Sequence, residues 1–172
     1  SQEAITLAGR QELSKLIVFW DNNDITIDGK VDLADATNQV DRFKSSGWNV
    51  LEIDGHDPIQ IDLAIIEAKK SNKPTMIACK THIALGSSAQ DTSKGHGALT
   101  DKSLIEETKK VYGWSQDAFF VPTEVKAAWE KIGKKGHEKK LSWENRFSSL
   151  SQKKQSEFLR NYSMEVPVAL NK

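Results

Sequence analysis

The sequence has little cysteine and proline, and it contains no long hydrophobic run. Its 172 residues include four prolines and one cysteine, Cys79. A single cysteine excludes an intrachain disulfide. That is typical of a reducing compartment, and with no signal peptide in the sequence we expect a cytoplasmic protein. No apolar run approaches the roughly 20 residues that a membrane-spanning helix needs, so we expect no membrane partner.

An excess of charge of either sign is also missing. Lys plus Arg and Asp plus Glu number 24 each, so the formal net charge is zero. This balance gives no electrostatic reason to expect nucleic acid or an anionic membrane as a partner. The hydrophobic content of 38% and the charged content of 28% are typical of a globular domain and not of a disordered chain.

Several motifs that identify common sites are absent as well. The chain contains no Gly-x-Gly-x-x-Gly, no P-loop, no Gly-x-Ser-x-Gly and no zinc-ligand spacing. It also begins without Met, on a segment with helical spacing, and we expect a piece of a longer protein. A functional prediction must therefore start from the organisation of the chain and from its polar loops.

Three apolar runs alternate with helical patterns in the first half of the chain. The patterns predict strands at 15–21, 48–53 and 74–81 and helices at 34–46 and 58–71. Strand, helix, strand, helix, strand is typical of right-handed βαβ units, so we predict an α/β fold with a parallel sheet. The first strand is apolar on both faces, as strands of parallel sheets are.

The second half of the chain is expected to be mainly helical. A loop rich in small polar residues is predicted at 86–97, and loops of this length in compact domains are usually functional or disordered. Helices are predicted at 101–112 and from Pro122 onward. From Lys134 the composition becomes polar and basic, which indicates a change of domain.

The most informative loop is Asp21–Gly29, which follows the first predicted strand. In open α/β sheets, ligands bind at the carboxyl ends of the strands. The side chain of Asn23 and the carbonyl of Ile25 are oxygen ligands of the kind that Mg²⁺ or Ca²⁺ prefers. An ordinary turn stabilised by the Asn side chain explains the same residues, and spacing alone favours this turn. Both interpretations stay open from spacing alone.

Five other residues carry weaker signals. His96 stands between two glycines, where it could contact a phosphate or transfer a proton, or simply face solvent. His56 is interpreted as a turn residue, and His82 follows the end of a predicted strand. Glu3 lies on the first predicted helix, where an exposed position is the usual one for a carboxylate. Cys79 is interpreted as a small core residue and not as a nucleophile.

A set of short sequence segments, which follow one another in a characteristic order, extends from residue 1 to about residue 129. They are Ser1–Ala4, Leu7–Gly9, Lys15–Val18, Asp21–Gly29, Arg42–Phe43, Gly47–Val50, Asp54–Asp57, Lys73–Thr75, Thr81–Ile83, Gly86–Ser87, His96–Leu99 and Gly113–Trp114. Together they closely resemble the thiamine diphosphate-binding part of the transketolase family. The resemblance implies a partial doubly wound parallel sheet of the thiamine diphosphate-binding fold, followed by a mainly helical linker. It places the C-terminal part of the cofactor-binding domain at 1–133 and the linker at 134–172.

The resemblance also implies a cofactor, thiamine diphosphate, with Mg²⁺ or Ca²⁺. Asn23 matches the family's metal-ligand Asn, which also lies against the diphosphate, and Ile25 matches its carbonyl ligand. Ile27 and Ile83 match apolar residues near the thiazolium ring. His96 matches a catalytic His that contacts the diphosphate and faces the substrate. The family's Gly-Asp-Gly, with a further metal ligand, is expected before the start of this chain.

The implied activity is the transfer of a two-carbon ketol unit from a ketose phosphate to an aldose phosphate, as in the pentose phosphate pathway and the Calvin cycle. The resemblance further implies a homodimer, with Glu3 in a carboxylate network at its interface. Because the groups that activate the aminopyrimidine belong to another domain, we expect residues 1–172 alone to be inactive. The alternatives are another thiamine diphosphate enzyme, such as a dihydroxyacetone synthase or a deoxyxylulose-phosphate synthase, and a non-catalytic subunit that retains the fold.

Overall fold

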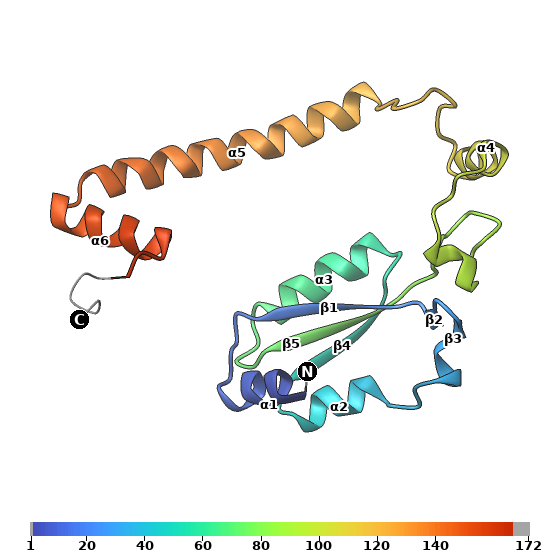
Figure 1. Ribbon diagram of the computed structural model, residues 1–172, viewed down its shortest axis with the longest axis horizontal. Helices are drawn as coiled ribbons and strands as arrows, with labels where there is room; N and C mark the ends of the chain where they lie inside the picture. Colours follow the sequence, from blue (N-terminus) through green and yellow to red (C-terminus); the bar gives the residue numbers. More distant parts are fainter. Residues whose placement is uncertain (1, 167–172) are drawn as a thin grey trace. The chain divides into compact units, whose positions relative to one another are not determined.

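A computed structural model describes residues 2–166 of the chain, so Ser1 and the last part of the predicted linker, 167–172, lie outside the described residues (Figure 1). Strands β1 (Ile17–Asn22), β5 (Thr75–Lys80) and β4 (Asn49–Asp54) form a three-stranded sheet in that order. Both pairings are parallel, with Ile17 and Asn49 each opposite Thr75. The prediction of an α/β fold with a parallel sheet is confirmed.

Helices cover both faces of this sheet. Helices α1 (Gln2–Arg10) and α2 (Gln39–Ser45) lie on one face, and α3 (Pro58–Ala68) lies on the other (Figure 1). Successive side chains of a strand point to opposite faces, so β5 supplies both halves of the core. Met76 and Ala78 pack with residues of α1, whereas Ile77 and Cys79 pack with Ala64 and Ala68 of α3.

Helix α1 is joined closely to the end of α2. Gly9 lies so near the carbonyl of Ser46 that a Cβ at residue 9 would collide with this backbone oxygen. The buried Trp48 completes the contact, because its indole N–H donates to the carbonyl of Ile5 at 2.8 Å. Its ring also meets Phe43 edge to face, with 5.0 Å between the ring centroids.

The start of one helix differs from the prediction and the start of another agrees with it, and the cap of each helix explains where it begins. Helix α2 begins at Gln39 and not at 34, because the side chain of Asn38 accepts from the N–H of Asp41 at 3.1 Å. The segment before it contains only one 3₁₀ turn, η1 (Val31–Leu33). Helix α3 begins at Pro58 as predicted, with Asp57 as its N-cap.

The chain divides into two compact units, Ser1–Gln116 and Asp117–Lys172. The first unit contains the sheet and α4 (Lys102–Val111), and the second contains α5 (Thr123–Ser148) and α6 (Gln152–Ser163). Helix α5 continues through positions 133 and 134, where the sequence analysis places the start of the linker. The assignment of 1–133 to a domain and of 134–172 to a linker stays a prediction.

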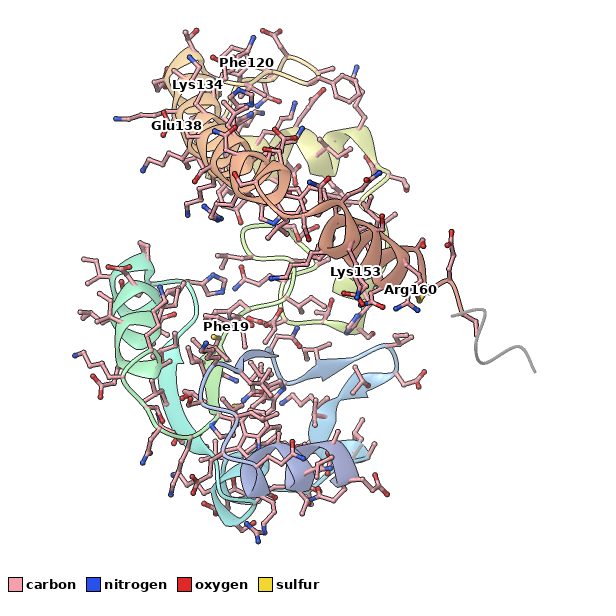
Figure 2. All side chains as sticks on the ribbon, turned by 90° about the vertical axis from the view of Figure 1, so that its left-hand side faces the viewer. Phe19, Phe120, Lys134, Glu138, Lys153 and Arg160 are labelled. Atoms are coloured by element: carbon pink, nitrogen blue, oxygen red, sulfur yellow. The ribbon has the colours of Figure 1, made fainter. Side chains whose placement is uncertain are left out.

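The polar run after Lys134 is helical because Lys and Glu are good helix formers and need no burial. Lys134 and Glu138 are exposed on α5, and their side chains project away from the helix (Figure 2). Near its end, α5 turns back into α6 around packed aromatic rings. Trp143 and Phe147 stack with 5.1 Å between their centroids, and Phe147 meets Phe158 edge to face at 5.4 Å. Within residues 2–166, none of the helices combines the length and apolar character that a membrane crossing requires.

Substituting Gly9 by Ala tests the contact between α1 and α2. We expect the variant to lose about 1–3 kcal/mol in free energy of unfolding, because the new Cβ forces two backbones apart. Urea unfolding followed by circular dichroism measures this loss. Gly133→Ala on α5 is the control, since a Cβ there meets nothing within 4 Å and alanine favours a helix. If the Gly9 variant and the parent were equally stable, α1 would not pack against the end of α2 as described.

The Asp57 cap predicts a dependence of stability on pH. The pKa of Asp57 lies below its ordinary value because its carboxylate accepts from the N–H of Ile59 at 2.8 Å and from the side chain and N–H of Gln60. A carboxyl group with a lowered pKa in the folded state stabilises the protein above the unfolded-state pKa. That stabilisation is lost as the pH falls through the folded-state value.

We therefore expect Asp57→Ala to lower the melting temperature near neutral pH, with a difference from the parent that shrinks once the pH falls below about 4. Asp62→Ala, at an exposed position of the same helix, is the matched control. Thermal unfolding across this pH range measures both variants. A difference that stayed constant at all pH values would argue against a charged cap at Asp57.

Candidate functional site

The carboxyl ends of the three parallel strands lie at one edge of the sheet. Strands β1, β4 and β5 end at Asn22, Asp54 and Lys80, and the chain leaves each of them in a polar loop. A cavity of about 1120 Å³ opens at this edge. Its lining includes Asp21, Asn23, Asp24, Ile25, His82 and Asp91. This is the edge at which an open α/β sheet binds its ligands.

Asn23 and Ile25 form the turn that the sequence predicts. The N–H of Ile25 donates to Asn23 Oδ1 at 3.0 Å, as in an Asx turn. An amide oxygen has two lone pairs, so this bond leaves one acceptor position on Asn23. The turn therefore explains the local backbone without using up the oxygen that a cation would need.

A short hairpin follows this turn. Strand β2 (Ile25–Thr26) pairs antiparallel with β3 (Gly29–Lys30), and the hydroxyl of Thr26 donates to the carbonyl of Gly29 at 3.0 Å. Ile27 stands in the two-residue turn and is 75% exposed. A large apolar side chain at the tip of a hairpin is well placed to pack against something outside this chain.

His96 reaches the same loop from a distant part of the sequence. It ends the 3₁₀ turn η2 (Ser93–His96), and its ring nitrogen Nε2 lies 3.1 Å from the carbonyl oxygen of Ile25. Since a carbonyl only accepts, this bond requires the proton on Nε2. The fold therefore brings together His96 and the loop of Asn23, as the predicted site requires.

Two further contacts connect the loop to the end of β5. Lys80 forms an ion pair with Asp24, and the hydroxyl of Thr81 donates to the carboxylate of Asp21. Asp24 adopts a left-handed backbone conformation, with φ 61°. Sequence reasoning missed these contacts, although the paired register of β1 and β5 would predict that the residues after Asn22 and those at the end of β5 lie close together.

The remaining predicted residues lie in different surroundings. Ile83 is half-buried, and its carbonyl accepts from the N–H of Asp91 at 3.2 Å. Glu3 is exposed on α1 and does not line the cavity. Cys79 is buried in β5, and burial raises the pKa of its thiol, with a smaller contribution from the charge of Asp21. Its interpretation as a core residue is confirmed.

The donor set at this edge suits a hard cation only in part. Within residues 2–166, no group of three or more His, Cys, Asp or Glu side chains could hold a metal ion. The amide oxygen of Asn23 and the carbonyl of Ile25 are oxygen donors of the type that Mg²⁺ and Ca²⁺ prefer, but each of these ions takes about six ligands or more. The chain thus fits a site to which it contributes a share of the ligands.

Comparisons with known proteins agree with this geometry. Residues 1–167 match the family model of the transketolase thiamine diphosphate binding domain. A transketolase of Rhodobacter capsulatus is 48% identical over 167 residues, which cover 96% of this chain and 25% of the relative. The chain thus spans about a quarter of the length of the curated relatives it matches.

Solved structures show the same likeness. Transketolase from Leishmania mexicana superposes with a TM-score of 0.87 at 30% identity, covering 97% of this chain and 26% of that one. A transketolase variant from Pichia stipitis, solved in complex with fructose 6-phosphate, gives 0.85 at 36% identity, covering 96% and 26%. The polar edge of the sheet, the family model and these relatives lead to one conclusion: the chain belongs to the transketolase family, of which it covers part of the thiamine diphosphate-binding domain.

Proposed function

We propose that residues 1–172 act within a full-length transketolase, where they bind the diphosphate end of thiamine diphosphate through Mg²⁺ or Ca²⁺. The observation that carries this proposal is the convergence of Asn23, Ile25 and His96, from loops 71 residues apart, on one edge of the sheet. Their oxygen and imidazole groups are the chemistry that a cation and a diphosphate require.

Each residue has its own task in this proposal. Asn23 Oδ1 and the carbonyl of Ile25 bind the cation, which balances the charge of the diphosphate. His96 contacts the diphosphate and faces the substrate, where its imidazole can hold or move a proton. Ile27 and Ile83 pack against the ring of the cofactor and keep water from it. When bound, thiamine diphosphate supplies the electron sink for the two-carbon unit.

The proposed reaction transfers a two-carbon ketol unit from a ketose phosphate to an aldose phosphate, as in the pentose phosphate pathway and the Calvin cycle. The complex of the Pichia stipitis relative with fructose 6-phosphate supports sugar phosphates as substrates. The relatives named above are all transketolases, which supports this function over the other thiamine-dependent enzymes and over a non-catalytic subunit.

The same proposal covers assembly and location. We assign residues 1–133 to the C-terminal part of the cofactor-binding domain and 134–172 to a helical linker. We place both in a homodimer, to whose interface Glu3 contributes a carboxylate. The exposed position of Glu3 supports this role, because its charge is available to a partner surface. The free thiol of Cys79 supports a cytoplasmic location, since reducing compartments keep thiols free.

Replacing Asn23 by Ala in a full-length transketolase that contains this chain tests the proposal. We expect the dissociation constant of thiamine diphosphate, measured by calorimetry with Mg²⁺ in excess, to rise about 10–100-fold, because a metal-ligand oxygen is lost. Ketol transfer at limiting cofactor should fall in parallel.

Asn72→Ala is the matched control for this experiment. Asn72 is exposed in the loop before β5, at the opposite edge of the sheet, so cofactor binding should be unchanged. Unaltered binding in the Asn23 variant would refute the assignment of the metal site, and the absence of ketol transfer in the parent would refute the function.

A further inference from the structure

Two histidines and an aspartate form a cluster at the same edge of the sheet, outside the residues assigned to the cofactor. The rings of His56 and His82 stack with 5.8 Å between centroids and 15° between planes. His82 Nδ1 lies 2.9 and 3.0 Å from the two carboxylate oxygens of Asp91. His56 follows β4, His82 follows β5, and Asp91 lies nine residues further on in the same loop as His82, so the cluster joins two loops.

The turn after β4 is built to place His56 beside His82. The N–H of His56 donates to Asp54 Oδ1 at 2.8 Å, and the N–H of Gly55 donates to the carbonyl of Lys80 at 2.8 Å. A Cβ at Gly55 would lie 2.5 Å from the side chain of Thr81, so only glycine allows this approach. His56 Nε2 then accepts from the backbone N–H of His82 at 2.9 Å.

Asp91 closes the loop that begins at His82. Its carboxylate accepts from His82 Nδ1–H and from the side-chain amide of Gln90, and the hydrogen bond from His82 is the main reason why the pKa of Asp91 lies below its ordinary value. Its backbone N–H donates to the carbonyl of Ile83 at 3.2 Å. Asp91 thus contacts the ring of His82 and the main chain of Ile83 at once.

These contacts determine the path of the segment from Ile83 to His96. Most of its residues are exposed or half-buried, and it contains no regular element apart from η2, so apolar packing contributes little to its order. His82 and Asp91 also line the cavity that contains Asn23 and Ile25. A change in the contacts of His82 and Asp91 would therefore alter the positions of the residues at both ends of the segment.

We propose that His82 and Asp91, supported by His56, are positioning residues that hold Ile83 and His96 in place at the proposed cofactor site. This inference rests on the proposed function, because it concerns the placement of two residues of that site. Small displacements of groups that orient substrate reduce rates strongly, by as much as about 100-fold for 1 Å. Loss of the His82–Asp91 contact should therefore lower turnover without unfolding the protein.

The test compares Asp91→Ala, Asp91→Asn and His82→Ala in the full-length transketolase. We expect Asp91→Ala and His82→Ala each to lower kcat/KM for a ketose phosphate donor about tenfold, and the double variant to lose no more than either one. Asp91→Asn should stay within about threefold of the parent, because its amide oxygen still accepts from His82 Nδ1–H. Melting temperatures should agree within about 2 °C, and Asp62→Ala on α3 is the control.

The proposal would be overturned if Asp91→Ala were as active as the parent. It would also be overturned if the loss in the double variant equalled the product of the losses in the two single alanine variants. If the parent itself shows no ketol transfer, the proposed function fails and amide hydrogen exchange decides the inference. In that case exchange across 82–96 must become about tenfold faster in Asp91→Ala than in Asp62→Ala. Unchanged exchange would overturn the inference.

Discussion

The parallel pairing of β5 with β1 and β4 is the constraint on which the rest of the structure depends. Thr75 lies opposite Ile17 on one side and Asn49 on the other, and the pairing continues in register to Lys80. Met76 and Ile77 are fully buried on opposite faces of the sheet, so a slip of one residue would exchange the two halves of the core. This register fixes where all three strands end.

Because the strands end at the same edge, polar residues far apart in the sequence meet there. Exposed ion pairs such as Lys80 with Asp24 contribute little to stability by themselves. Their effect is local: they join the loop after β1 to the end of β5, just as His96 joins η2 to the carbonyl of Ile25. The apolar core supplies the stability, and the polar contacts determine the shape of the edge.

The fold could be predicted from the sequence because its signals are local. Apolar runs, Pro58 at a helix start and glycines at turns indicate the strands and helices of the first unit. The late start of α2 depends on a cap at Asn38, and the continuation of α5 past Lys134 depends on helix propensity without burial. Both effects are weaker than hydrophobic periodicity, which explains why the predicted boundaries differ from the observed ones.

The site was less accessible to sequence reasoning. Spacing alone could not decide between a turn and a cation site at Asn23, and the structure shows that the turn leaves a lone pair for a cation. Resemblance to the transketolase family indicated Ile27, Ile83 and His96, and the proximity of His96 to the loop depends on a tertiary contact. The His82–Asp91 pair has no motif, since its partners meet only when the loop after β5 has folded.

We propose that the loop after β1 binds the cation of the cofactor through Asn23 Oδ1 and the carbonyl of Ile25. A crystal structure of the full-length enzyme with thiamine diphosphate and Mn²⁺ in place of Mg²⁺ tests this most directly, because anomalous scattering locates the metal. We expect both oxygens at about 2.0–2.6 Å from the metal. A metal bound to the diphosphate with neither oxygen among its ligands would contradict it.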